Sequence, residues 1–437
     1  MGTESSDNSP LLTGIDEAED EQQQQQHVRH NEVTSLTAVF SISTTIVGAG
    51  IMGLPETLRI NGLVPALLLI IGVALLTDKS VDFLLKHTTA AEADTYGAVM
   101  SHSFGCPGRV IAQLCIIVNS FGTLVVYLII IADVLSGSTA ASVHYTGVLE
   151  ELAGGHTWWN TRFTVMVFTV VCLIPLVLLS EIDSLKVSSA LAVLLAIFFV
   201  LATAVIACCK LVAGDIGVPR LFPDFYHSNV TIWTCFSVVP VVVTAFLCQH
   251  CAHPILAELN KTSDPHVVVR CALVLCTAIY LSTSLFAYLL FGENTLEDVL
   301  SNFNADLGVP YISSIVRIGY AIHLYLVFPL LHFSLRKNLA ELMFSRADAL
   351  VDSRRRFYLL TGCAMLVCLV CACLVASIWV VFEITGSSSA IGLCYILPAA
   401  LELRIPLGTH SERMAAWFML VVGIISALIT WIGLSVA

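Results

Sequence analysis

The chain has 437 residues, of which 57% are hydrophobic and only 12% are charged, and its mean hydropathy is +0.87. A soluble domain usually carries about 25% charged residues, so this composition excludes an ordinary soluble protein and indicates a polytopic membrane protein. The formal net charge of −12 argues against nucleic-acid binding, which needs a clustered basic surface.

Residues 1–33 are polar, acidic and low in complexity, and no apolar segment typical of a signal peptide follows the start. This segment cannot bury a core, so we expect a disordered cytosolic tail. Asp7 stands four residues before the pair Leu11 and Leu12, a spacing that fits an acidic dileucine sorting signal. The pattern predicts a sorting adaptor as a partner, with a chance match as the alternative.

Eleven apolar runs follow the tail, each long enough to cross a bilayer as a helix. They lie at about 34–59, 61–84, 108–135, 162–180, 185–209, 231–256, 268–291, 310–335, 357–377, 381–402 and 414–435. The sequence therefore predicts an all-α polytopic membrane protein with eleven transmembrane helices.

The basic residues predict how these spans are oriented. With a cytosolic N-terminus, 15 of the 20 Lys and Arg fall on cytosolic segments, 4 fall on the other side, and Arg317 lies within a span. Positive charge is enriched on the cytosolic side of membrane proteins, so we expect a cytosolic N-terminus and a lumenal C-terminus. The sequon at Asn229 then lies on the non-cytosolic side, as a candidate glycosylation site.

The first span carries a concentrated helix-breaking signal. Gly48, Gly50 and Gly53 lie within six positions and Pro55 follows. Backbone groups freed by a break in a membrane helix are tolerated where they line a cavity or bind a ligand, as in secondary transporters. Close helix packing by small residues is the alternative interpretation.

Prolines also predict interruptions of the sixth span, at Pro240 and Pro254, and of the eighth span, at Pro329. The first and sixth spans are five apart, which is the pattern of two five-helix units in inverted topology. We expect a first repeat at 34–209, a second repeat at 231–402 and an additional helix at 414–435.

Several short motifs, in their order and spacing, carry a resemblance. They are Thr45 to Pro55, Thr95-Tyr96-Gly97-Ala98-Val99 in an expected loop, Ile130 to Gly137, Phe246-Leu247-Cys248 with Pro254-Ile255 and Glu258-Leu259, Leu289 to Gly292, and Val316 to Tyr320 with Phe328-Pro329. Over about residues 34–435 the chain resembles the amino acid/auxin permease family, and within it the plant and yeast vacuolar amino-acid transporters. The resemblance implies a LeuT-like five-plus-five inverted repeat with an eleventh helix, and proton- or sodium-driven transport of amino acids.

An amino-acid substrate needs donors for its carboxylate and acceptors for its ammonium group. Freed amides and hydroxyls of the first span supply donors, aided by the helix dipole, and freed carbonyls of both broken spans supply acceptors. The break in the sixth span is expected near Thr244-Ala245-Phe246-Leu247-Cys248. Phe246 is expected either to close over the substrate or simply to pack. The candidate substrate-binding residues are Thr44, Thr45, Val47, Gly48, Ala49, Gly50, Thr244, Phe246 and Cys248.

Further polar residues are candidates for coupling or gating. Many relatives have Cys-His in the sixth span, whereas this chain has Cys248-Gln249-His250, so both Gln249 and His250 are candidates. A lone charge in a membrane is unfavourable, so Arg317 would pair with a structural partner, such as a carboxylate or helix-end carbonyls, or bind the acidic side chain of a substrate.

Three other groups have two open interpretations each. Glu56 would titrate with transport or be inert. His323 would couple protons or only form structural hydrogen bonds. Asp133 would act in gating or in helix capping.

The driving ion is predicted from the residues that replace sodium ligands. In the sodium-coupled branch the ligands resemble an Asn in the first span and a Thr in the eighth; here Thr44 stands at the first position, and Tyr325 and Val327 at the second. A site in which two of the side-chain oxygen ligands are replaced would hold sodium poorly. We therefore expect proton coupling or facilitated flux.

We therefore predict a secondary active amino-acid transporter of the vacuolar membrane that works by alternating access. An amino-acid-sensing receptor of the same fold with little flux is the alternative. A membrane enzyme is disfavoured, because no nucleophile elbow or acidic-plus-His constellation is present. We expect no catalytic residue, no cofactor and no metal site, and the 15 cysteines lie mostly in apolar runs as small packing residues.

Overall fold

The computed structural model describes residues 34–140, 143–155, 157–178, 186–225, 230–257, 259, 263–303, 310–344, 354–375 and 377–436. The dileucine residues Asp7, Leu11 and Leu12 and the sequon residue Asn229 lie outside these ranges. The long helices are α2 (Ser35–Ile46), α3 (Gly50–Asn61), α4 (Leu63–Ala90), α5 (Tyr96–Ser136), α7 (Arg162–Val177), α8 (Lys186–Ala213), α9 (Ile232–Phe246), α10 (Gln249–Ala257), α11 (Pro265–Phe291), α13 (Pro310–Met343), α14 (Arg354–Leu374), α15 (Ile378–Thr385), α16 (Leu397–Arg404) and α17 (His410–Val436).

Shorter elements lie in the connections and in the tenth span. They are the hairpin β1 (Ser138–Ala140) and β2 (Val143–Tyr145), α6 (Val148–Ala153), η1 (Trp158–Asn160), η3 (Gly292–Asn294), α12 (Val299–Asn302), and the π-helical segments η5 (Gly386–Ala390) and η6 (Gly392–Ile396). The two strands pair antiparallel, with Ser138 opposite Tyr145.

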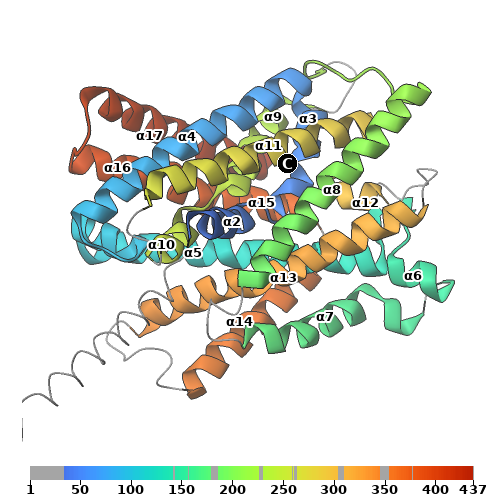
Figure 1. Ribbon diagram of the computed structural model, residues 1–437, viewed down its shortest axis with the longest axis horizontal. Coiled ribbons are helices and arrows are strands. Elements are labelled where there is room, and N and C mark those ends of the chain that lie inside the picture. Colours follow the sequence, from blue (N-terminus) through green and yellow to red (C-terminus); the bar gives the residue numbers. More distant parts are fainter. Residues whose placement is uncertain are drawn as a thin grey trace, which may run out of the picture.

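The long helices pack side by side into one bundle (Figure 1). Among the described residues, nine helical segments are long and apolar enough to cross a membrane, the bent pair α2 and α3 counts as a tenth, and α7 is a shorter apolar helix. These segments account for the eleven predicted spans. Large apolar side chains such as Leu68, Leu201 and Leu428 are exposed on the sides of the bundle, where a bilayer rather than water would surround them.

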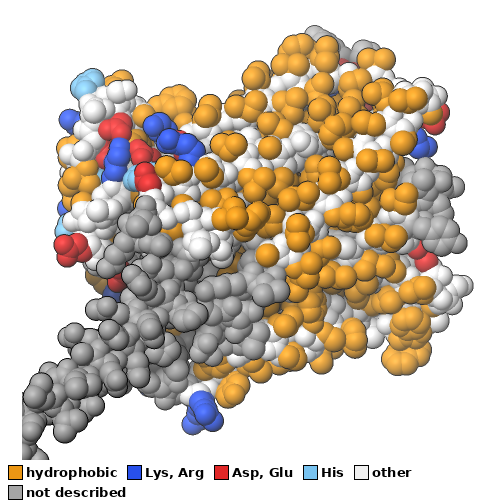
Figure 2. Space-filling view, in the orientation of Figure 1, with side chains coloured by type: hydrophobic (Ala, Val, Ile, Leu, Met, Phe, Trp, Pro, Cys, Tyr) orange, Lys and Arg blue, Asp and Glu red, His pale blue; other side chains and the backbone are white. Residues whose placement is uncertain are grey.

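The two ends of the bundle are distinct in composition and structure. Figure 2 shows hydrophobic side chains over the middle of the visible face and charged side chains gathered toward its left and right margins. We call the end that carries Arg59, the hairpin, α6 and α12 the Arg59 end. The opposite end, which carries Thr95, Lys337 and Glu402, we call the Thr95 end.

The first span is broken where the glycines predict. Helix α2 ends at Ile46, α3 begins at Gly50, and the two axes differ by 57°. Between them, Gly48 N–H turns back to the Ile46 carbonyl at 2.9 Å. Gly53 and Pro55 lie inside α3, so the break itself occupies only residues 47–49.

The sixth span breaks inside the predicted window. Helix α9 ends at Phe246, and α10 begins at Gln249 after two non-helical residues. The two breaks lie directly against each other, since a Cβ added to Gly50 would lie 2.6 Å from the Cβ of Ala245. The absence of a side chain at Gly50 therefore allows the broken helices to touch backbone to backbone.

Three expectations about proline and loop positions are wrong. Pro329 does not interrupt the eighth span, because α13 is continuous through it. Pro240 lies inside α9, six residues before that helix ends at Phe246, and Pro254 lies inside α10. The segment that begins at Thr95 is not a loop: Thr95 caps α5, its hydroxyl accepts the Ala98 N–H at 3.2 Å, and the helix bends later, at Gly105. A proline removes only one N–H donor, and packing against neighbouring helices can preserve the remaining ladder.

The tenth span contains two turns of π-helix, which the sequence did not predict. The segment from Gly386 to Ile396 joins α15 to α16 without a break. A Cβ on Gly386 would lie 2.6 Å from the carbonyl oxygen of Pro240. The tenth span thus packs closely against the first half of the sixth. Such π-helical turns are rare and often occur at functional sites.

Candidate functional site

The carbonyl groups freed at the break of the first span are not left bare. Three consecutive carbonyls, which a continuous helix would have paired internally, each accept a hydrogen bond from a side chain of a distant helix. The pairs are Tyr280 Oη to Ile46 O at 2.6 Å, His323 Nε2 to Val47 O at 2.9 Å, and Tyr320 Oη to Gly48 O at 2.7 Å. Helices α11 and α13 therefore supply the donors that α2 and α3 lack.

Tyr280 joins the two broken spans. Its hydroxyl lies 2.6 Å from the Ile46 carbonyl and 2.8 Å from the Ala245 carbonyl, and one O–H is shared between the two acceptors. Its ring packs edge to face against Phe246, with the ring centroids 5.0 Å apart. Phe246 is fully buried in this conformation, so it packs here between the two breaks.

Tyr127 of α5 accepts a hydrogen bond from a backbone N–H group that is freed at the break. The Ala49 N–H donates to the Tyr127 hydroxyl oxygen. A Cβ on Gly48 would lie 2.0 Å from that oxygen, so only glycine leaves room for the phenol. The freed amide and the small residue beside it therefore act together, because the missing side chain creates the space in which the hydroxyl binds.

The predicted threonine ligands bond to their own helices. The hydroxyls of Thr44, Thr45 and Thr244 donate to the carbonyls of Phe40, Ile42 and Pro240 at 2.8, 2.8 and 2.7 Å. A hydroxyl that donates within its helix keeps lone pairs with which it can accept a hydrogen bond. These residues are therefore suited to an ammonium group rather than to a carboxylate.

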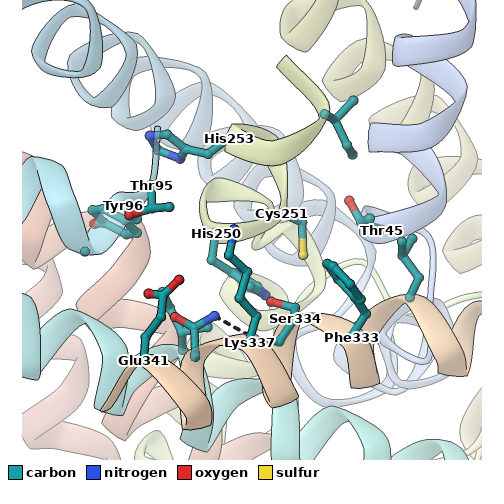
Figure 3. A pocket seen from close by; sticks show the side chains of 15 residues that line it. Thr45, Thr95, Tyr96, His250, Cys251, His253, Phe333, Ser334, Lys337 and Glu341 are labelled. Carbon is teal, nitrogen blue, oxygen red and sulfur yellow. Dashed lines mark hydrogen bonds between the residues drawn. The ribbon is translucent and has the colours of Figure 1, made fainter. Parts of the chain in front are cut away.

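A narrow cavity of about 60 Å³ reaches toward the break from the Thr95 end. Figure 3 shows α13 presenting Phe333, Ser334, Lys337 and Glu341 along one wall, with His250 and Cys251 of α10 facing them and Thr45 of α2 at the far side.

His250 is 8% exposed, and neither ring nitrogen has a hydrogen-bond partner among the described residues. Gln249 has a different role: its side chain accepts the Cys248 N–H at 3.1 Å and donates to Ser80 at 3.1 Å. Of these two neighbours, His250 faces the cavity and Gln249 fixes the backbone of the second break.

A much larger cleft, of about 980 Å³, opens at the Arg59 end. Its lining is acidic, with five carboxylates against two arginines: Glu56, Asp133, Glu293, Glu297 and Asp298, with Arg59 and Arg162. Glu56 accepts from Arg59 Nε at 2.6 Å, and Asp133 pairs with Arg162 at 3.1 Å. Glu293 pairs with Arg220, which does not line the cleft, at 2.8 Å. The lining therefore carries a net negative charge, with three of its five carboxylates paired with arginine.

Asp298 is a titratable group of this cleft that lies in the connection between α11 and α13 rather than in a span. Its carboxylate accepts the Leu300 N–H at 3.0 Å and caps α12. Burial is the main cause that raises the pKa of Asp298 from its ordinary 3.8 to about 7. A modest change of pH near neutrality would therefore change its charge.

Arg317 is buried and paired. Its guanidinium donates to the Glu151 carboxylate at 2.7 Å and to the Thr146 carbonyl at 3.0 Å, and these contacts hold α6 and the preceding turn against α13. The Glu151 carboxylate lies in the connection between α5 and α7, remote from both breaks in sequence. In this conformation Arg317 holds α6 against α13 at the Arg59 end.

The tyrosines at positions 127, 280 and 320 were missed by the sequence analysis, although they donate to or accept from the break. Each is a phenol in a long apolar helix, and each is at most 1% exposed. A buried phenol usually requires a hydrogen-bond partner, which was the available signal. Their partners are unpredictable from one sequence, because Tyr280 and Tyr320 lie 234 and 272 residues away from the carbonyls they bind.

The sequence of the chain matches a known family of membrane proteins over almost its full length. The family model described as "Transmembrane amino acid transporter protein" matches residues 31–437. The chain is 43% identical over 406 residues to amino acid transporter AVT6A of Arabidopsis thaliana, covering 92% of this chain and 88% of that one. It is 26% identical over 436 residues to the putative sodium-coupled neutral amino acid transporter 11 of Mus musculus, covering 96% and 86%.

The fold is shared with solved transporters of low sequence identity. MhsT, solved in complex with L-phenylalanine, has a TM-score of 0.58 at 16% identity, covering 91% of this chain and 98% of that chain. The manganese transporter of Eremococcus coleocola has a TM-score of 0.56 at 12% identity, covering 90% and 86%. The predicted eleven-helix, LeuT-like architecture is confirmed, and the chain belongs to the transmembrane amino acid transporter family.

Proposed function

We propose that this protein is a secondary active transporter that moves amino acids across an internal, vacuolar membrane by alternating access. The observation that carries the proposal is the meeting of the two broken spans. Freed carbonyls and an amide are gathered there, with an open cleft on the Arg59 end and a narrow cavity on the Thr95 end. A site of this kind lies midway between two solutions and can be exposed to each in turn.

The substrate binds where the two breaks meet. Its ammonium group replaces the phenol donors at the carbonyls of Ile46 and Gly48, and its carboxylate takes amides at the start of α3, where the helix dipole favours an anion. Binding by backbone groups recognises the part of the substrate that all amino acids share. The side chain of the substrate would then be selected by the apolar surroundings of the site, which include Phe246.

The repeat boundaries 34–209 and 231–402 and a cytosolic N-terminus are part of the proposal. In that orientation the Thr95 end faces the cytosol and the acidic cleft faces the vacuolar lumen, with the C-terminus. The asymmetric distribution of Lys and Arg supports this assignment.

We also propose that transport is independent of sodium and coupled to protons. Val327, at one position where a hydroxyl ligand would be needed, is an apolar residue with 1% of its surface exposed. The Thr44 hydroxyl donates within its own helix. A sodium site requires several hard oxygen ligands in one place, and these residues reduce the number available.

The test is counterflow by the purified full chain in proteoliposomes, with a panel of labelled amino acids. We expect exchange of at least one amino acid above that of empty liposomes, unchanged when choline replaces sodium at fixed pH. Binding of an amino acid without measurable exchange would favour the sensing receptor. Loss of exchange on sodium removal would refute sodium independence.

A pair of matched variants tests the location of the site. Gly50→Val places side-chain atoms into the backbone of Ala245, whereas Gly72→Val adds them where a Cβ meets nothing within 4 Å. We expect the first variant to lose exchange and the second to retain it, at equal reconstituted protein. Equal exchange by both variants would refute the proposed site.

A further inference from the structure

His323 is a buried histidine whose two ring nitrogens both face acceptors. It lies in α13 and is fully buried. Its Nδ1 lies 2.7 Å from the Ala192 carbonyl of α8, and its Nε2 lies 2.9 Å from the Val47 carbonyl at the break. The ring therefore connects three elements, α8, α13 and the first span, through two acceptor-only groups.

This geometry requires two protons on one ring. A neutral imidazole has one N–H donor and one lone-pair acceptor, whereas an imidazolium has two donors. With a neutral ring, one nitrogen lone pair would face a carbonyl lone pair at hydrogen-bond distance. Only the protonated ring can donate to both carbonyls at once. Burial opposes its charge, so the ring holds the second proton weakly and can release it.

The surroundings of the ring contain no compensating carboxylate among its contacts in the described part of the chain. The Tyr320 ring of the same helix lies 4.7 Å away, centroid to centroid. Other titratable groups around the same break are Tyr127 of α5, Tyr280 and Cys276 of α11, and Cys248 of the sixth span. Asp298, which lines the cleft of the Arg59 end, acts electrostatically on Tyr320. The carbonyl dipoles of Val47 and Ala192 are thus the direct partners of the charge.

We propose that His323 is the binding site of the coupled proton, held as an imidazolium between α8, α13 and the broken first span. This inference rests on the proposed transport function. His323 is fully buried in this conformation, so the proton exchanges with water in conformations that open the break. Loss of that proton breaks the bond to the Val47 carbonyl.

The two hydrogen bonds of His323 hold different segments, and breaking each one releases a different segment. Ala192 belongs to the continuous helix α8, so its carbonyl position is fixed by the helix. Val47 lies between α2 and α3, and His323 supplies the one hydrogen bond that its carbonyl accepts among those described. Deprotonation therefore releases the first span from α13 and leaves α8 in place, which couples the proton to movement of the broken helix.

The experiment compares His323→Gln with His332→Gln in proteoliposomes. Glutamine can donate to one carbonyl but cannot take up a proton. His332 is a matched control, because it is also a fully buried histidine of α13 and has no described contact with the break. Two readouts are measured for each: exchange at equal pH on both sides, and accumulation driven by a pH difference of one unit.

For one proton per substrate, a one-unit pH difference supports roughly tenfold accumulation. We expect roughly tenfold accumulation for the wild type and the His332→Gln variant. Any exchange that remains in the His323→Gln variant should not respond to the gradient, so this variant should show no accumulation. Gradient-driven accumulation by His323→Gln would overturn the inference, and so would a wild type that exchanges substrate without responding to the gradient. A wild type without any exchange would instead refute the proposed function itself.

A second measurement applies if His323→Gln does not fold. Nuclear magnetic resonance of isotope-labelled imidazole nitrogens is recorded at mildly acidic pH in a His87→Gln, His253→Gln background, which removes two other buried rings with acceptor partners. We expect one imidazole with two N–H groups that exchange slowly with heavy water. Absence of such a ring would overturn the inference.

Discussion

The contact between Gly48 and Tyr127 predicts a specific failure of additivity. In Gly48→Ala the new Cβ would lie 2.0 Å from the Tyr127 hydroxyl oxygen, so the phenol must move and release the Ala49 N–H. In Tyr127→Phe the same N–H loses its acceptor directly. An unpaired buried donor is unfavourable by about 1–3 kcal/mol, which is a factor of roughly 5 to 150 in an equilibrium constant.

Because both substitutions abolish the same hydrogen bond, the double variant should resemble Tyr127→Phe alone. After the hydroxyl is removed, the Tyr127 Cζ position lies 3.1 Å from the added Cβ, which is tight but can be relieved by a small shift. The expected coupling energy is therefore about 1 kcal/mol or more in favour of the double variant. The assay is substrate affinity in reconstituted protein, with Gly72→Ala as the control. Additivity of the two single effects within about 0.5 kcal/mol would refute the reasoning.

Three further predictions concern the Arg59 end and the tail. The raised pKa of Asp298, about 7 against an ordinary 3.8, means that the folded state binds the proton more tightly. Stability should therefore fall as pH rises from about 4 to about 7, and Asp298→Asn should remove that slope in thermal unfolding in detergent. Glu151→Ala should lower the free energy of unfolding by about 3 kcal/mol, because it leaves the buried Arg317 guanidinium without its carboxylate partner. Lys210→Ala, which removes a cation that lies 3.9 Å from the exposed Asp215, should lower it by less than about 1 kcal/mol; equal effects would contradict the assigned contacts. Replacing Leu11 and Leu12 by Ala should move a fluorescent fusion away from the vacuolar membrane, and unchanged localisation would show that the dileucine pattern is accidental.

The elements that local chemistry determines could be predicted from the sequence. Glycines at positions 48 and 50 indicate the break of the first span because they combine low helix propensity with the absence of a side chain. The apolar runs predict the eleven spans because each must match the thickness of a bilayer. The break of the sixth span was located from its motif, and it occurs at Leu247 and Cys248, within the predicted window.

The features that depend on distant packing could not be predicted. Pro329 suggested an interruption, but the neighbours of α13 keep that helix continuous. The π-helical turns of the tenth span depend on its close approach to Pro240. The phenol donors of the break depend on how α5, α11 and α13 are placed in the bundle. Each case involves residues far apart in the sequence, and a single sequence contains no direct record of such contacts.

Side chains already occupy the carbonyls of the break, and this has a consequence for substrate binding if substrate binds at the proposed site. A substrate ammonium group cannot simply occupy empty carbonyls, because Tyr280 and Tyr320 already donate to them. Binding exchanges neutral hydrogen bonds for charge-assisted ones, which are roughly twice as strong, and the net gain is smaller than the new bonds alone. The displaced hydroxyls belong to α11 and α13, so substrate cannot bind without loosening the contacts of those helices with the first span. A moderate affinity is therefore linked to helix movement, which is the relationship that transport, rather than tight storage of a ligand, requires.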